Sequence, residues 1–174
     1  MPLHDFNGTS PRIADDAFIA PGAQIVGNVK IGAGASVWYN CALRADVQTI
    51  VLGPRSNIQD GSVVHVTRKT HGTFIGADCL VGHMAMIHGC TLDDHSFVGL
   101  GAIVMDGCVI ETDAMLAAGA MLTPGKRIPS GELWAGRPAK FFQKLKPEQI
   151  ERNRAGAAGY VELAAAHREE IGSG

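Results

Sequence analysis

The sequence predicts an all-β solenoid followed by a C-terminal α-helix, and three observations lead to this fold class. Aliphatic residues recur every six positions over most of the chain, a period that fits neither an α-helix nor an alternating strand. Glycine is abundant, with 22 residues in 174, and aromatic residues make up only 6% of the chain. That composition is typical of many short strands joined by tight turns. Residues 146–171 then change to a helical pattern.

The repeat consists of four runs of hexads separated by short breaks. Its aliphatic positions are Ile13, Ile19, Ile25, Ile31, Val37 and Leu43, then Leu52, Ile58 and Val64, then Ile75, Val81 and Ile87, and finally Leu92, Val98, Val104, Ile110, Leu116 and Leu122. One short strand and one turn per hexad, with three hexads per coil, predict a triangular prism whose aliphatic side chains stack inside. About six coils at a strand spacing of ~4.8 Å give a prism roughly 30 Å tall. Glycines after the aliphatic residues, such as Gly53 and Gly99, are expected to relax the backbone at corners.

The end of the chain is expected to leave the repeat, starting with the segment "PSGELWAGRPAKFFQKL". The helix that follows has Pro147 and Glu148 in its first turn, where both residue types are favourable. Its apolar stripe is formed by Ile150, Ala157, Val161 and Ala164. We therefore expect a β-helix domain over residues 1–145, with a short N-terminal lead-in, and a helix within residues 146–174 that covers one face of the prism.

Bulk properties narrow the functional classes. The net charge of −2 gives no basic surface for nucleic acid. The N-terminus has no signal-peptide pattern and no apolar run approaches ~20 residues, so we expect a cytoplasmic protein without a membrane span. None of the four cysteines forms a CxxC pair, which favours free thiols. Cys90 and Cys108 lie one coil apart and should stack as a small apolar ladder, with a disulfide as the alternative.

The stretch "VGHMAMIHGC" places His83 and His88 five residues apart, at different positions in successive hexads. Five extended residues span roughly 16 Å, whereas each ligand of one zinc ion lies only about 2.0–2.1 Å from it. These two histidines of one chain therefore cannot share a metal, but they can belong to sites between subunits. His65 follows Val64 as His88 follows its own aliphatic residue, which makes His65 and His88 the natural pair within one chain. The alternative is that these histidines are surface or structural residues.

The blocks "NCALRADVQTIVLGPRSNIQDGSVVH" and "VGHMAMIHGC" closely resemble the γ-class carbonic anhydrases. The resemblance covers about residues 10–165 and is nearest to bacterial homologues that lack the long acidic loop. It implies a left-handed parallel β-helix with a C-terminal helix, assembled as a homotrimer. It also implies reversible hydration of carbon dioxide to bicarbonate.

The resemblance also implies roles for particular residues. His65, His83 and His88 match the three metal ligands, with His83 donated by the adjacent subunit and with zinc, or iron or cobalt in some members, as the metal. Three neutral imidazoles leave zinc an open position, where bound water has a pKa near 7. The other matches are Arg44 and Asp46 as a pair that bridges subunits, Gln59 as the residue that orients the water or bicarbonate, Asn57 and Asp60 as neighbouring polar positions, and Tyr160 as a tyrosine reaching towards the pocket.

The chain departs from the family pattern at two glutamate positions, which hold Val47 and Arg68 here. We therefore expect slow turnover, or a different proton shuttle. His71 in the following loop is a candidate shuttle, because the unperturbed pKa of histidine lies near 6.5; a solvated loop histidine is the alternative. Arg44 and Asp46 could likewise form only a structural ion pair.

Two other functions remain open. The phrase "WAGRPAKFF" resembles the last coil of hexapeptide-repeat acyltransferases, where coenzyme A binds, but such an enzyme needs one histidine base rather than three clustered histidines. Loss of both glutamates suits a trimeric scaffold that binds metal without catalysis. Metal content separates the acyltransferase from the carbonic anhydrase.

Overall fold

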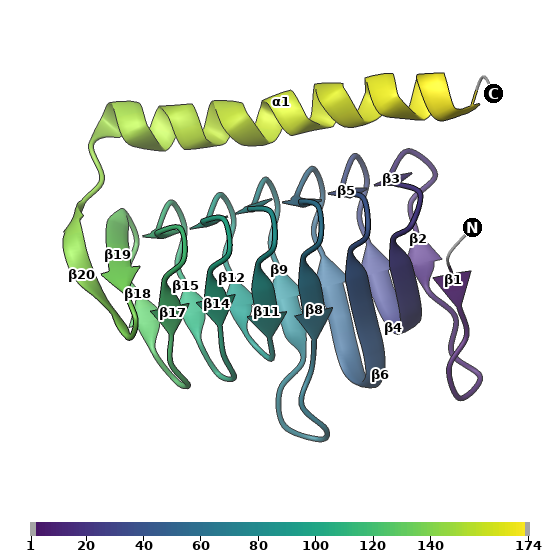
Figure 1. Ribbon diagram of the computed structural model, residues 1–174, viewed down its shortest axis with the longest axis horizontal. Helices are drawn as coiled ribbons and strands as arrows, with labels where there is room; N and C mark the ends of the chain where they lie inside the picture. The colour runs from purple at the N-terminus through teal and green to yellow at the C-terminus, as the bar shows by residue number, and fades with distance from the viewer. Residues whose placement is uncertain (1–2, 173–174) are drawn as a thin grey trace.

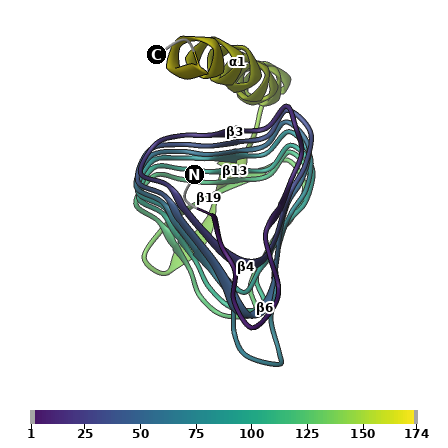
Figure 2. The ribbon, with the colours of Figure 1, turned by 90° about the vertical axis from the view of Figure 1, so that its right-hand side faces the viewer.

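The chain winds into a triangular parallel β-solenoid of about seven turns, with one helix lying along it (Figures 1 and 2). The computed structural model describes residues 3–172. Figure 2 looks along the solenoid and shows three faces, one of which carries the helix α1 (Pro147–Gly172). The predicted fold class is confirmed. The predicted domain division stays a prediction, and its residues 1, 2, 173 and 174 lie outside the described residues.

Two faces of the prism form one continuous sheet of 12 strands. Its strands are β1 (Leu3–His4), β2 (Arg12–Ile13), β4 (Gln24–Ile31), β6 (Ala42–Leu52), β8 (Val63–His65), β9 (Thr73–Ile75), β11 (Met86–His88), β12 (Thr91–Leu92), β14 (Ile103–Val104), β15 (Val109–Ile110), β17 (Met121–Leu122) and β18 (Arg127–Ile128). The long strand β6 pairs with β8 through its first part and with β9 through its last part. It therefore runs around a corner of the prism, where the hexad pattern predicts separate short strands.

The third face is a sheet of eight strands beneath the helix. Its strands are β3 (Phe18–Ile19), β5 (Ser36–Val37), β7 (Asn57–Ile58), β10 (Leu80–Val81), β13 (Phe97–Val98), β16 (Met115–Leu116), β19 (Glu132–Gly136) and β20 (Ala139–Lys144). All of them pair in parallel except β20, which turns back antiparallel to β19.

The last coil extends further than the sequence indicated. Ile128 is fully buried and continues the aliphatic ladder beyond Leu122. Trp134 of β19 pairs in parallel with Leu116, one coil earlier in the chain. The expectation that residues 129–145 leave the repeat is therefore wrong for β19 and right only for β20. The extra coil also explains why the solenoid has about seven turns rather than the six expected.

The core contains two stacked ladders rather than one. The predicted aliphatic positions from Ile25 onward are all buried. A second ladder, mostly of small residues, lies two positions before the aliphatic residues and is equally buried; its small members include Ala23, Ala35, Cys41, Ser56, Ser62, Cys79, Ala85, Cys90, Ser96, Ala102, Cys108, Ala114 and Ala120. All four cysteines belong to this ladder and are free thiols, as predicted. Val29 and Ile50 take the same position before Ile31 and Leu52, so larger side chains fit there in the long strands β4 and β6.

Glycines after the aliphatic residues serve close packing rather than backbone freedom. Gly53 and Gly99 have no positive φ. A Cβ atom at Gly53 would lie 2.3 Å from the carbonyl oxygen of Gly76, and one at Gly99 would lie 2.4 Å from the backbone nitrogen of Ala118. The proposal that these glycines relax strained corners is therefore wrong, because the backbone of the next coil occupies the space of a side chain.

The helix crosses the coils in the reverse order of the chain (Figure 1). Near its start, Arg154 forms a bidentate ion pair with Asp113. Near its end, His167 packs against Phe18 and Trp38. Ala157 and Ala164 of the predicted stripe are buried, whereas Ile150 and Val161 are half-buried. The predicted helix is confirmed, and its apolar stripe covers the eight-stranded face.

Candidate metal centre

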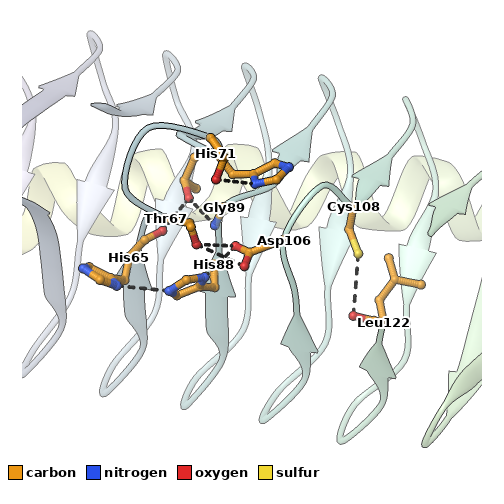
Figure 3. Close-up of polar contacts among 10 residues, drawn as sticks. His65, Thr67, His71, His88, Gly89, Asp106, Cys108 and Leu122 are labelled. Carbon is orange, nitrogen blue, oxygen red and sulfur yellow. Dashed lines mark hydrogen bonds and ion pairs between the residues drawn. The ribbon is translucent and has the colours of Figure 1, made fainter. Parts of the chain in front are cut away.

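His65 and His88 lie side by side at the corner that follows β8 and β11 (Figure 3). They are register partners on adjacent parallel strands, as their matching hexad positions predicted. Nδ1 of His65 lies 3.1 Å from Nε2 of His88. Two histidines from successive coils therefore present one ring nitrogen each to a common point outside the prism.

The other ring nitrogen of each histidine contacts a carboxylate. Nε2 of His65 lies 3.1 Å from Asp46, and Nδ1 of His88 lies 2.7 Å from Asp106. An imidazole that donates a proton to a carboxylate keeps a lone pair on its other nitrogen, which is the form that binds metals. Each histidine of the pair therefore has its own carboxylate partner.

Further contacts hold the two carboxylates. Asp46 also accepts a hydrogen bond from Arg44, and Asp106 accepts one from the hydroxyl of Thr67 at 3.0 Å. Burial tends to raise the pKa of Asp46, but the hydrogen bonds from His65 and Arg44 outweigh it and hold that pKa below its ordinary value. Burial acts in the same direction on Asp106, and the hydrogen bonds from His88 and Thr67 likewise lower its pKa. Both carboxylates are therefore charged at neutral pH.

His83 occupies a different corner of the prism, in the turn between β10 and β11. Its Nδ1 lies 2.9 Å from Asp60, and both side chains are 41% exposed. His83 lies in the turn before β11, and His88 is the last residue of β11. The two histidines therefore lie at opposite ends of this strand. One chain thus contributes a pair of histidines at one corner and a single histidine at the preceding corner.

Gln59, Asn57 and Tyr160 lie on or beneath the helix-covered side, close to the corner of Asp60. Gln59 is buried, and its side-chain nitrogen donates to the side-chain oxygen of Asn57 at 3.0 Å. Tyr160 packs against Trp38, with ring centroids 5.4 Å apart. Burial raises the pKa of Tyr160, and the negative charge of Asp60 raises it further. The structure therefore associates Gln59, Asn57, Asp60 and Tyr160 with the His83 corner, and Arg44 and Asp46 with the paired histidines.

The loop after β8 places His71 over the neighbouring coils. The ring of His71 lies close to Gly107: a Cβ atom built on that glycine would be 3.3 Å from Nε2 of His71. A positive charge on His71 would also help to lower the pKa of Asp106. His71 is exposed, and its Nδ1 lies 3.0 Å from the Thr70 hydroxyl. Arg68 is exposed in the same loop, and Val47 packs partly against the core. His71 is thus near the paired histidines, while its role as a shuttle stays a prediction.

Sequence reasoning missed Asp106 and Thr67. Asp106 lies 18 residues after His88, the same one-coil interval that relates Cys90 to Cys108, so the repeat itself could have identified it. Thr67 could not be found in this way, because the loop between β8 and β9 interrupts the repeat. Among residues 3–172 of a single chain, no group of three or more His, Cys, Asp or Glu side chains could hold a metal ion.

Comparisons with known proteins find relatives of similar sequence and fold. A family profile described as "Bacterial transferase hexapeptide (six repeats)" matches residues 10–45. The chain is 48% identical over 166 residues to "Gamma carbonic anhydrase 2, mitochondrial" of Arabidopsis thaliana, covering 92% of this chain and 60% of that protein. It is 41% identical over 152 residues to the "Probable carbonic anhydrase" of Methanocaldococcus jannaschii, covering 87% of this chain and 95% of that protein. A crystal structure of a hexapeptide transferase family protein from Anaplasma phagocytophilum matches with 46% identity and a TM-score of 0.91, covering 94% and 96% of the two chains.

Fold and sequence together define a hexapeptide-repeat β-solenoid. The chain belongs to the γ-class carbonic anhydrase family, whose members are metal-dependent. It spans 60% of the length of two mitochondrial γ-carbonic anhydrases of Arabidopsis thaliana. Across residues 3–172, no helix has the length and apolar character needed to span a membrane. The cytoplasmic location stays a prediction, since the Arabidopsis relatives are described as mitochondrial.

Proposed function

We propose that this protein hydrates carbon dioxide reversibly to bicarbonate at a metal site shared between two subunits of a homotrimer. The observation that carries the proposal is the pairing of His65 with His88, each with a carboxylate partner, while His83 lies at another corner. Each copy then contributes His65 and His88 to one site and His83 to another. Three copies around a threefold axis would complete three sites. Membership of the carbonic anhydrase family supports this reading.

The residues fit a metal ion. Two nitrogens that are both 2.0–2.1 Å from one tetrahedral zinc lie about 3.3–3.4 Å apart, close to the 3.1 Å between His65 and His88. His65 and His88 of one subunit and His83 of the next would hold the ion, which we take to be zinc, with iron or cobalt as alternatives. A zinc ion in such a site acidifies water and so supplies the nucleophile for attack on carbon dioxide.

The remaining residues would position substrate and neighbouring subunits. Gln59, fixed by its hydrogen bond to Asn57, would orient the reacting water or bicarbonate from the His83 side. Asp60 would hold the ring of His83 through its Nδ1. Arg44 is half-exposed beside Asp46, where its guanidinium can reach a second subunit. Tyr160 of the helix α1 packs against Trp38 and would support the His83 side of the site.

The face between the two histidine corners supports a subunit contact. Its outward side chains form an apolar column of Ala42, Val63, Met86, Ile103 and Met121, aligned across adjacent parallel strands. At its edge, Met84 is 71% exposed beside His83. A second copy of the chain is the occupant that would bury this column and complete the metal site at once.

Mixed trimers test the shared site directly. A His83→Ala chain and a His65→Ala chain each spoil a different half of the site, so each homotrimer should lose tight zinc binding. In mixed trimers, some interfaces combine the two intact halves, and zinc occupancy should recover to a fraction set by the mixing ratio. Metal analysis of trimers verified by native mass spectrometry provides the measurement, and no recovery would refute the shared site.

Proton removal should limit turnover, because Val47 and Arg68 replace the glutamates of the family pattern. Asp46 and Val47 also line a groove of about 250 Å³ with Phe6 and Asn7, which is large enough for a small buffer molecule. We expect kcat to rise with imidazole concentration and then saturate while kcat/KM changes little, since that ratio reports the steps through attack. Val47→Glu should raise kcat at low buffer, and His71→Ala should lower it only if His71 is the shuttle.

An acyltransferase is the second candidate, favoured by the turn that joins β19 to β20. This hairpin carries Gly136, Pro138 and Ala139 of the "WAGRPAKFF" segment, and one of the matching structures is described as a hexapeptide transferase family protein. Acetyl transfer from acetyl-coenzyme A without any dependence on zinc would favour this candidate. A trimer that binds zinc but shows no hydration above background at any buffer concentration would instead favour a scaffold.

A further inference from the structure

Asp106 has a contact that the family resemblance did not assign. It comes from the coil after His88, and its Oδ1 lies 2.7 Å from Nδ1 of that histidine. We propose that Asp106 is a positioning residue that fixes the tautomer and ring orientation of His88 for metal binding, and that Thr67 holds Asp106 in place. This inference rests on the proposed metal site.

The contact determines which nitrogen of His88 is available. A carboxylate accepts a proton from Nδ1–H, so Nδ1 carries the hydrogen and Nε2 keeps its lone pair. Nε2 is the nitrogen that faces His65, 3.1 Å away. Without Asp106, the imidazole could place its proton on Nε2 or rotate about its side-chain bonds, and either change would remove the ligand.

Thr67 makes a second contact with the carboxylate. Its hydroxyl lies 3.0 Å from both oxygens of Asp106, so the carboxylate that contacts His88 is also hydrogen-bonded to Thr67. Thr67 belongs to the irregular segment between β8 and β9, whereas Asp106 follows β14, two strands further along the sheet. The loop thus contributes a specific contact to the histidine pair rather than only a bulge on the surface.

The backbone leaves room for this arrangement. A Cβ atom at Gly89 would lie 2.1 Å from Oδ1 of Asp106 and 2.9 Å from Cβ of His71. Gly89 also has a φ of +57°, which other residues rarely adopt. The glycine after His88 therefore allows the carboxylate of the next coil to approach the histidine ring.

The test measures metal affinity and histidine tautomer rather than catalysis. Chelator competition with zinc would give the Kd of the wild type, Asp106→Ala, Asp106→Asn and Thr67→Val. Asp113→Asn is the matched control, because it breaks an ion pair with Arg154 far from the histidines. Loss of the carboxylate should weaken zinc binding by roughly 10–100-fold, as for other partners of metal-binding histidines. Asp106→Asn, which keeps an accepting oxygen, and Thr67→Val should give smaller losses, and the control should give none.

Nitrogen-15 NMR of the metal-free protein at pH 8 adds a readout that a purely structural role would not change. His88 should be mainly the Nδ1–H tautomer in the wild type and should shift towards Nε2–H in Asp106→Ala, with an unchanged melting temperature as the check on folding. Wild-type zinc affinity in Asp106→Ala, with an unchanged tautomer, would overturn this inference while leaving the proposed function intact. Wild-type zinc affinity in His65→Ala and His83→Ala would overturn both this inference and the proposed function.

Discussion

The coils from Leu92 to Ile128 differ sharply from those between Ala42 and Ile75. In the former, the aliphatic residue returns every six positions, and every strand is two residues long. In the latter, β6 runs for 11 residues around a corner, and the chain between β8 and β9 forms a loop (Figure 1). Arg44, Asp46, His65 and Thr67 all come from the irregular coils. The regular coils thus form the frame of the solenoid and contribute Asp106 to the site, whereas the irregular coils contribute these four residues.

The largest expected effect tests the frame. Ile110→Asp would bury an unpaired charge among stacked aliphatic side chains and should reduce the free energy of unfolding by several kcal/mol. Val109→Asp is the matched control, because the neighbouring side chain is only half-buried and points outward. Thermal denaturation of both variants gives the comparison. Equal melting temperatures for the two variants would show that the assigned hexad register is wrong.

The small-residue ladder runs through both kinds of coil, and Cys41 tests it in the irregular one. Burial raises the pKa of Cys41 from 9.0 to about 11. The folded state therefore retains the proton, and this contribution to stability is present below pH 9 and is lost as the pH rises to 11. Between pH 8 and pH 11, the free energy of unfolding of the wild type should therefore fall by about 2 kcal/mol more than that of Cys41→Ala. Denaturant titrations at pH 8 and pH 11 would measure the difference, and identical pH dependence in both proteins would contradict it.

The helix spans both kinds of coil, and the surroundings of Gly156 and Gly159 differ. A Cβ atom at Gly159 would meet no atom within 4 Å, whereas one at Gly156 would lie 3.3 Å from Cδ1 of Leu80. Gly159→Ala should therefore stabilise the protein by about 0.5–1 kcal/mol through helix propensity alone. Gly156→Ala should gain less, because Leu80 must move. A greater gain at Gly156 in chemical denaturation would show that the helix packs differently on β10.

The smallest expected effect on stability is at the site itself. His65→Ala removes a partly exposed side chain and leaves Asp46 paired with Arg44, so the free energy of unfolding should fall by less than about 1 kcal/mol. Zinc binding should nevertheless be lost, which separates the functional coils from the structural ones. Calorimetry alongside equilibrium dialysis gives both quantities. A loss of stability comparable to that of Ile110→Asp would mean that the paired histidines belong to the frame.

The sequence by itself determined the solenoid, its aliphatic ladder, the helix and the pairing of His65 with His88. These features follow from a period of six and from hydrophobic burial, which are local and repeat along the chain. Only the tertiary structure revealed the corner-crossing strand β6, the continuation of the repeat into β19 and the carboxylate of Asp106 beside His88. Each of these depends on contacts between coils that lie far apart in sequence, and the loop that brings Thr67 to Asp106 has no period from which its path could be predicted.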